Sequence, residues 1–358
     1  AHPGLRLTIA VAASAILPQY GDVLAAMEED GIPCDAKIIM TLAGGSTVAM
    51  AKTTGIGITE FATAFDNLKP DIVLIRGDRY EVLAAAVAAG YMNIPIAHLE
   101  GGDLSGSIDE SVRHAVTKLA HIHLTTNEQS AARVRQMGED PRYVFVMGCP
   151  ELEQLADHSI DITSAELNQK GVGSDLNLQE PFLMVMLHPI TTDGENRKYT
   201  EMLLHVINDM GIQTVWFWPN VDAGTDDVAK AIRVFREKIH PSHIHFITYF
   251  QPDKFTALLK KSACLVGNSS AGIKECSFLG IPAVNIGERQ NGRMHGPNVM
   301  DARTDSNDIR AAIERQLQHG PYERSDVYYH KNACSLIAET LATLPLYTQK
   351  QFRDSPHG

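Results

Sequence analysis

The sequence predicts an α/β protein with two doubly wound halves, each built around a parallel sheet. Short apolar runs alternate with helical stretches along most of the chain, which is the pattern of repeated βα units. The run Asp71–Arg76 (DIVLIR) is almost continuously apolar, as expected for a parallel strand buried on both faces. A more polar stretch, Glu151–Glu180, separates two such series and is expected to be a linker or insertion.

In the first half, each predicted strand is followed by a helix or a turn signal. A helix over Asp22–Glu28 ends at Gly31, and Gly138 closes a helix that Thr126 and Gln129 start with a capping box. The other expected helices are 46–68, 80–89 and one that starts near Ile108. The expected strands are 5–12, 36–40, 71–76, 94–99, 122–125 and 144–147.

The second half repeats this alternation from Phe182 onward. Strands are expected at 182–187, 214–218, 244–247, 264–267 and 283–286. Helices are expected near Tyr199, Asp226 and Pro252, and then over 307–316 and 327–344. Two α/β halves joined by a linker favour a cleft between them, where ligands often bind.

Length, charge and cysteine content exclude several classes of protein. A chain of 358 residues suggests about two domains. No apolar run reaches the ~18 residues that a membrane span needs, and the net charge of -12 argues against a nucleic-acid partner. The five cysteines form no CxxC pair, so we expect neither structural zinc nor disulfides, and a cytoplasmic location.

The stretch His98–Lys118 concentrates reactive groups behind a predicted buried strand. It contains Glu100, Asp103, Asp109 and Glu110, followed by Arg113 and His114. Capping a helix explains acids at its first turn, but it does not explain Glu100 directly after a strand. Because ligands bind at the carboxyl ends of strands in open α/β sheets, this stretch is a candidate catalytic site.

Two further side chains follow predicted strands. Asp78, in RGDRYE, either caps the next helix or takes part in acid–base chemistry. His188, in LHPITTD, is either structural or functional, and its position in a loop at a strand end favours function.

The second half carries a candidate site for a nucleoside diphosphate. Asn268, Ser269 and Ser270 follow a strand and open a helix, where N–H groups and hydroxyls can hold phosphate. Glu275 is either an ordinary solvated side chain or a ligand for ribose hydroxyls. Arg289 and Arg293 lie in a glycine-containing loop that suits a diphosphate. No GxGxxG follows the first strand, so an NAD site has no support.

Six strings together carry a resemblance to a known family: RGDRYE, HLEGGDLSGSIDESVRHAVTKLAHIHL, LHPITTD, WPNVDAG, GNSSAGIKE and NIGERQNGR. The chain resembles the hydrolysing UDP-N-acetylglucosamine 2-epimerases, from about Leu5 to Phe352. The resemblance implies a GT-B-like fold. Its two Rossmann-like domains would be residues 1–155, with 338–358 crossing back, and residues 156–337.

The resemblance also implies a reaction and a set of site residues. UDP-N-acetylglucosamine and water would become UDP and N-acetylmannosamine, without cofactor or metal. The implied catalytic residues are Asp78, Glu100, Asp109, Arg113 and His188. The implied substrate- and nucleotide-binding residues are Asn220, Asn268, Ser269, Ser270, Glu275, Arg289 and Arg293. Glu100 or Asp109 is expected to be the base, with Asp78 assisting. A homodimer or homotetramer is implied by the family alone.

Two departures from the family pattern keep alternatives open. Leu5–Ala12 aligns with the family's second strand, so we expect the native protein to contain further residues before Ala1. Ala15 stands where the family often has histidine, which favours another sugar nucleotide, such as a 2,4-diacetamido sugar linked to UDP or GDP. The remaining alternative is a non-catalytic nucleotide-sugar-binding protein or a GT-B glycosyltransferase.

Overall fold

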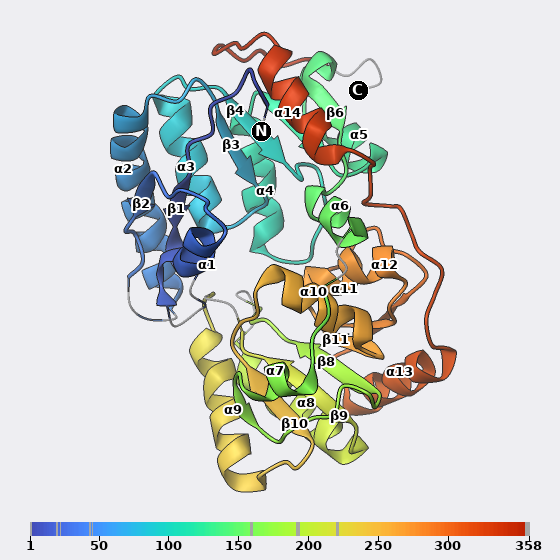
Figure 1. Ribbon diagram of the computed structural model, residues 1–358. Coiled ribbons are helices and arrows are strands. Elements are labelled where there is room, and N and C mark those ends of the chain that lie inside the picture. Colours follow the sequence, from blue (N-terminus) through green and yellow to red (C-terminus); the bar gives the residue numbers. More distant parts are fainter. Residues whose placement is uncertain are drawn as a thin grey trace. The chain divides into compact units, whose positions relative to one another are not determined.

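The computed structural model describes residues 2–18, 21, 23–42, 44, 46–157, 160–190, 194–219 and 222–354 (Figure 1). The chain divides into two compact units. Unit 1 contains residues 1–104, 108–153 and 328–358, and unit 2 contains 105–107 and 154–327. The return to unit 1 therefore begins at Tyr328, ten residues before the position expected from the sequence.

Unit 1 contains two parallel sheets that share one hydrophobic core. One sheet has four strands in sequence order, β3 (Val73–Arg76), β4 (Ile96–Leu99), β5 (Ile122–Thr125) and β6 (Val144–Val146). The other pairs β1 (Ala10–Ala12) with β2 (Ala36–Ile38). Ile38 from β2 and Val73 from β3 belong to the same buried cluster.

Helices of unit 1 follow the strands as the sequence predicts, with shifted ends. They are α1 (Val23–Glu29), α2 (Thr47–Leu68), α3 (Tyr80–Tyr91), α4 (Ile108–Leu119), α5 (Glu128–Gln136), α6 (Pro150–Asp157) and α14 (Ala333–Thr343). Helices α2 and α3 lie side by side (Figure 1). Five alanines of α3 are buried, and Gly57 of α2 lies so close to one of them that an added Cβ would be 2.9 Å from Ala84 Cβ.

The capping box predicted for α5 is wrong. Asn127 is the N-cap, and its side chain accepts a hydrogen bond from Ser130 N. The Thr126 hydroxyl instead donates to Asp103 Oδ1, at 2.7 Å. Since Asn is as good an N-cap as Thr, the sequence alone did not decide between the two neighbours.

The C-terminal segment returns to unit 1 because it has an apolar face to bury there. Ile337 of α14 packs with Leu99, Leu124 and other residues of the four-stranded sheet. Farther along, Lys350 donates hydrogen bonds to the backbone of Lys118 and of Ala120. The predicted helix 327–344 begins later than expected, because Asn332, its N-cap, has a left-handed backbone with φ of 61°.

Unit 2 has a seven-stranded sheet in the order β13-β12-β11-β8-β9-β10-β7. The strands are β8 (Phe182–Met186), β9 (Gln213–Phe217), β10 (Ile244–Ile247), β11 (Cys264–Gly267), β12 (Ala283–Ile286), β13 (Val299–Ala302) and β7 (Val172–Gly173). All pairs are parallel except β7 with β10. After the edge strand β7, the chain enters the central β8, runs outward through β9 to β10, and then restarts from β11 on the other side of β8. This is the doubly wound order, and its switch point lies between β8 and β11.

The helices of unit 2 are α7 (Ser164–Asn168), α8 (Asn196–Met210), α9 (Thr225–Ile239), α10 (Pro252–Lys261), α11 (Ser270–Ile273), α12 (Glu275–Leu279) and α13 (Ser306–His319). The stretch expected to be a linker thus contains α6, α7 and the edge strand β7, and β13 was missed. A two-residue edge strand is too short for a period-2 pattern. Among the described residues, no helix is both long and apolar enough to cross a membrane.

Candidate active site

The candidate catalytic residues of unit 1 lie at the carboxyl edge of its four-stranded sheet. Strands β3 and β4 are adjacent and parallel, and the ladder pairs Arg76 with Leu99. The residues that follow, Gly77-Asp78 and Glu100, therefore leave the sheet at the same edge. Two carboxylates that are 22 positions apart in sequence become neighbours because parallel strands end together.

Asp78 is held by a buried arginine. Arg113, on α4, is 1% exposed, and its Nη2 contacts Asp78 Oδ2. Its Nη1 donates to the carbonyl of Asp103 at 2.7 Å. Asp109 lies one turn before Arg113 on the same helix, so their side chains share one helix face. Three predicted catalytic residues thus belong to α4 or contact it.

Glu100 combines burial, backbone strain and an ion pair. Glu100 is 5% exposed. Its backbone φ is 68°, a left-handed conformation that a non-glycine residue adopts only at a cost of about 1–3 kcal/mol. Its N–H donates to the carbonyl of Leu124 at 3.0 Å, which holds the turn. Arg76 Nε lies 2.6 Å from Glu100 Oε1. Strain held in place by such contacts clusters at functional sites, which supports Glu100 as a functional residue.

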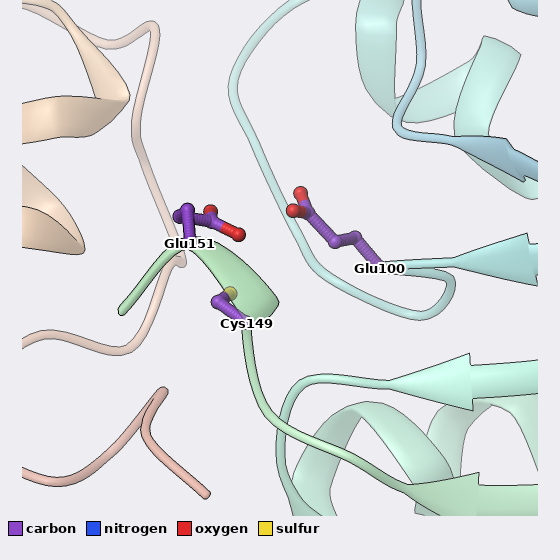
Figure 2. Close-up of side chains that lie close together, drawn as sticks. All are labelled: Glu100, Cys149 and Glu151. Atoms are coloured by element: carbon purple, nitrogen blue, oxygen red, sulfur yellow. The ribbon is translucent and has the colours of Figure 1, made fainter. Parts of the chain in front are cut away.

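A second acid, Glu151, faces Glu100 from the start of α6 (Figure 2). One oxygen or sulfur atom from each of Glu100, Cys149 and Glu151 lies within 4.8 Å of the other two. In the described part of the chain, these three residues therefore form a group of potential metal ligands. The guanidinium of Arg76, however, contacts both carboxylates. Although burial opposes its charge, the two acids raise the pKa of Arg76 above its ordinary value. A positively charged group of the protein itself thus contacts two of these three potential ligands.

Two buried polar side chains, His98 and Asp103, hold the loops at the carboxyl edge of the unit 1 sheet in place. Burial lowers the pKa of His98 to about 4, so its ring is neutral at physiological pH. Its Nε2 then donates to the carbonyl of Gly77 at 2.8 Å and fixes the loop that carries Asp78. Asp103 Oδ1 accepts from Thr126 and Ser130, at 2.7 and 2.6 Å, and so ties the loop after β4 to α5.

In unit 2, His188 and Asn268 follow the two strands that flank the switch point. The Asn268 side chain is bonded on both sides to the backbone of His188. Its Oδ1 accepts from His188 N at 2.7 Å, and its Nδ2 donates to the His188 carbonyl at 2.8 Å. Both residues line a pocket that Tyr199 and Thr304 also line. Asn268 thus fixes the loop that carries His188.

The start of α11 presents small polar groups at the same edge. Ser269 is its N-cap and accepts from Ala271 N at 3.3 Å, and Ser270 is the first helical residue. Gly267, which precedes them, has a φ of 142°, and an added Cβ would lie 2.1 Å from the Met186 carbonyl oxygen. Only glycine therefore permits this close approach of β11 and β8. Glu275 begins the next helix, α12, and is half-buried.

The loop after β12 brings its arginines to this position. Arg289 Nη1 and Gln290 Nε2 both donate to the carbonyl of Asn268, at 3.0 and 2.9 Å. Arg293 Nη1 donates to Gln290 Oε1 at 2.8 Å. The two guanidinium groups therefore lie close to the start of α11, where the sequence predicts a phosphate site.

Most predicted site residues are thus grouped within their own unit. Asp78, Glu100, Asp109 and Arg113 gather at the edge of the unit 1 sheet, and His188, Asn268, Ser269, Ser270, Glu275, Arg289 and Arg293 follow strands of the unit 2 sheet. Asn220 lies outside the described residues. Sequence reasoning missed Arg76, Glu151 and Gln290. The signal for Arg76 was a charged residue that ends an otherwise apolar strand, directly before Gly77.

The chain matches a family model over most of its length. The model describes UDP-N-acetylglucosamine 2-epimerase and covers residues 1–342. The chain belongs to the UDP-N-acetylglucosamine 2-epimerase family. The resemblance inferred from the six sequence strings is therefore confirmed.

Individual members of the family differ in the sugar that their names give. The chain is 29% identical over 330 residues to a UDP-N-acetylglucosamine 2-epimerase of Neisseria meningitidis, covering 91% of this chain and 84% of that protein. It is also 29% identical over 346 residues to a UDP-N,N'-diacetylbacillosamine 2-epimerase (hydrolyzing) of Legionella pneumophila, covering 96% and 90%. Equal identity to both relatives does not favour one sugar over the other.

Solved structures support the fold class. The Neisseria meningitidis UDP-GlcNAc 2-epimerase, solved bound to UDP-GlcNAc, has a TM-score of 0.74 and 19% identity, with 95% of this chain and 92% of that chain covered. The predicted GT-B-like α/β fold with two Rossmann-like units is confirmed.

Proposed function

We propose that this epimerase-family enzyme is a hydrolysing 2-epimerase, which converts UDP-N-acetylglucosamine and water to UDP and N-acetylmannosamine. The observation that carries the proposal is the pair of carboxylates Asp78 and Glu100 at one sheet edge. Each is ion-paired to an arginine, and Glu100 has a strained backbone. A carboxylate is a group that can serve as the base in removing a proton from carbon.

In the proposed mechanism, a carboxylate of unit 1 removes the proton on C2 of the sugar. Glu100 or Asp109 is the proposed base, and Asp78 assists. The electron pair of the C2–H bond forms a C1–C2 double bond as the C1–O bond to UDP breaks. Water then adds across the double bond, with the hydroxyl on C1 and the proton on C2 in the inverted configuration. One nucleotide sugar and one water are consumed, and one UDP and one free sugar are formed, so the atoms balance.

The unit 2 residues are proposed to bind the leaving diphosphate. As the C1–O bond breaks, negative charge grows on the β-phosphate oxygen. Arg289 and Arg293, together with the N–H groups and hydroxyls of Ser269 and Ser270, are suited to this charge. His188 is proposed to contact the substrate from its fixed loop, and Glu275 and Asn220 are proposed to contact the nucleoside. No cofactor or metal is part of this proposal.

The test is incubation with UDP-N-acetylglucosamine and no acceptor. Release of UDP together with free N-acetylmannosamine supports the proposal. In water labelled with ¹⁸O, the C1 oxygen of the product is expected to carry the label, because water replaces UDP. Binding without any release of UDP would instead indicate a nucleotide-sugar-binding protein, and release that needs an acceptor sugar would indicate a glycosyltransferase.

A second candidate substrate is a 2,4-diacetamido sugar nucleotide. The observation that favours it is the small side chain of Ala15, at a position where the family often has histidine. A competition assay with UDP-N-acetylglucosamine, UDP-N,N'-diacetylbacillosamine and its GDP form discriminates between these substrates through their relative kcat/KM values.

The proposal also covers the setting in which the enzyme works. All five cysteines are free, which supports a reducing compartment, and we propose the cytoplasm. We propose sialic-acid-type sugar synthesis as the use of the product, and a homodimer or homotetramer as the assembly. Light scattering of the purified protein tests the assembly.

A further inference from the structure

The segment that follows α14, residues 345–353, is bonded to unit 1 at several points, and we call it the strap. The Tyr347 hydroxyl donates a hydrogen bond to the carbonyl of His121 at 3.0 Å. Farther along, the N–H of Arg353 donates to the carbonyl of Gly138, also at 3.0 Å. The strap is therefore attached to the residues that follow α4 and α5.

The ring of His121 is a further attachment point, and its two nitrogens face groups of opposite kinds. The residue is buried. Its Nδ1 accepts a hydrogen bond from the N–H of Ile96 at 3.2 Å, so this nitrogen carries no proton. Its Nε2 lies 3.0 Å from the carbonyl oxygen of Thr348 in the strap, so this nitrogen carries the proton. Only the neutral ring with its proton on Nε2 satisfies both contacts.

We infer that neutral His121 is a pH-sensitive attachment point for the strap, and that protonation of its ring releases residues 345–353 from unit 1. A second proton would bind to Nδ1, where it would point at the N–H of Ile96. Two donors would then face each other in a buried place, and the N–H at the start of β4 would lose its acceptor. The inference is independent of the proposed reaction, in which the strap has no part.

Other titratable groups surround this attachment point. They are Lys350 and Tyr347 of the strap, Lys118 of α4, His123 of β5, and Glu139 and Tyr143 between α5 and β6. Among them, the Lys350 ammonium opposes a positive charge on His121, and the Glu139 carboxylate favours it. Because Lys350 Nζ lies 2.6 Å from Glu139 Oε2, these two charges largely offset each other at the ring.

The direction of the pH effect follows from the burial of the ring. Burial, together with the charge of Lys350, lowers the pKa of His121 below its ordinary value of 6.5, and the Thr348 carbonyl and Glu139 oppose this only in part. The attached strap therefore binds fewer protons than the released one. Its stability is fully present above about pH 6.5 and falls as the pH decreases. In that range, the equilibrium constant for release should rise by up to about tenfold per pH unit.

The experiment follows the His121 ring and the Arg353 amide by NMR in the full chain, labelled with ¹⁵N in histidine and arginine. The two signals are identified by their loss in His121→Gln and Arg353→Lys. At about pH 8, the ring should be neutral with its proton on Nε2, and it should titrate with a midpoint below that of an exposed histidine. Protection of the Arg353 N–H from hydrogen exchange, corrected for the intrinsic exchange rate, should fall over the same pH range.

Two variants test whether the ring causes the release. In His121→Gln, the amide can donate to the Thr348 carbonyl and accept from the Ile96 N–H, but it does not titrate. Protection of the Arg353 N–H should then stay constant between about pH 8 and pH 5. Lys350→Gln removes a positive charge near the ring, so the midpoint of His121 should rise, and this variant keeps the test decisive if His121→Gln does not fold.

His319→Gln is the matched control. The His319 ring also contacts a tyrosine, with its centroid 3.7 Å from that of Tyr322, and its Nδ1 lies 3.0 Å from a backbone carbonyl, that of Gly320. It belongs to unit 2, however, and makes no contact with the strap through these groups. The control should lose protection of the Arg353 N–H at acid pH as the wild type does.

Three results would overturn the inference. The first is a His121 ring that carries its proton on Nδ1 or is already charged at about pH 8. The second is protection of the Arg353 N–H that falls with pH in His121→Gln as much as in the wild type. The third is a His121 midpoint that does not rise in Lys350→Gln.

Discussion

The two units present their candidate site residues at the same kind of sheet edge, but they build it from different groups. Unit 1 uses charged side chains in pairs, Asp78 with Arg113 and Glu100 with Arg76. Unit 2 uses hydrogen bonds to the backbone. The Asn268 side chain forms hydrogen bonds with the His188 backbone, and the Arg289 side chain donates one to the Asn268 carbonyl.

This difference matches the two kinds of chemistry that the proposed reaction needs. Proton transfer at carbon requires a carboxylate of defined ionisation, and ion pairs control ionisation. Binding a diphosphate requires donors at fixed positions, and a rigid network of backbone bonds supplies them. Substitutions at the two edges should therefore fail in different ways, and the predictions below separate rate from affinity and from stability.

The largest expected effect is on the rate and comes from Glu100→Gln. Gln keeps the size of the side chain but cannot accept a proton, so UDP release should fall by about 10³-fold or more. Affinity for UDP should change less than about threefold, because the proposed diphosphate residues lie in unit 2. A coupled assay for UDP measures the first quantity and calorimetry the second. Normal turnover in this variant would remove Glu100 from the mechanism.

The next effect is on stability and tests whether charge pairing in unit 1 is also structural. The Glu139 side chain is 1% exposed and contacts His123, Lys118 and Lys350. Burial alone would raise the pKa of Glu139, but hydrogen bonds from these three groups lower it to about 2. Since its ordinary value is 4.5, the carboxylate stabilises the folded state above about pH 4.5, and this contribution is lost as the pH falls toward about 2.

Glu139→Gln should therefore lower the free energy of unfolding by about 2–3 kcal/mol at pH 7, and the difference from wild type should shrink below about pH 4.5. Urea unfolding at a series of pH values measures this. Glu201→Gln is the control, because Glu201 is in an exposed pair with Arg197 and should cost less than about 1 kcal/mol. A difference that stays constant across this pH range would contradict the prediction.

The smallest effect is on affinity and concerns unit 2. Asn268→Leu leaves the N–H and carbonyl of His188 without their amide partners, so the loop after β8 should loosen. We expect UDP affinity to fall by about 10–30-fold, which corresponds to about 1.4–2 kcal/mol. Asn268→Asp keeps the acceptor for His188 N and should lose less than Leu does. If both variants bind UDP as the wild type does, the His188 loop is not held by this side chain.

Sequence reasoning succeeded where the signal is local. Continuous apolar runs located most strands, and the ends of these runs correctly placed Asp78, Glu100, His188 and Asn268 just after strands. It failed where the signal is short or shared between neighbours: the two-residue strand β7, the strand β13, and the N-cap of α5, which is Asn127 rather than Thr126. In each case contacts with distant parts of the chain are decisive: β7 pairs with β10, β13 pairs with β12, and the Thr126 hydroxyl binds Asp103.

By itself, the sequence determined the α/β class, the family and the kinds of groups at the site, because apolar periodicity and residue chemistry are written along the chain. The tertiary structure alone decided which charges meet. The pairing of Arg76 with both Glu100 and Glu151 joins positions 24 and 75 residues apart, and the bond between Asn268 and His188 joins positions 80 residues apart. Such contacts depend on which strands are adjacent and in what register, and no local pattern encodes that.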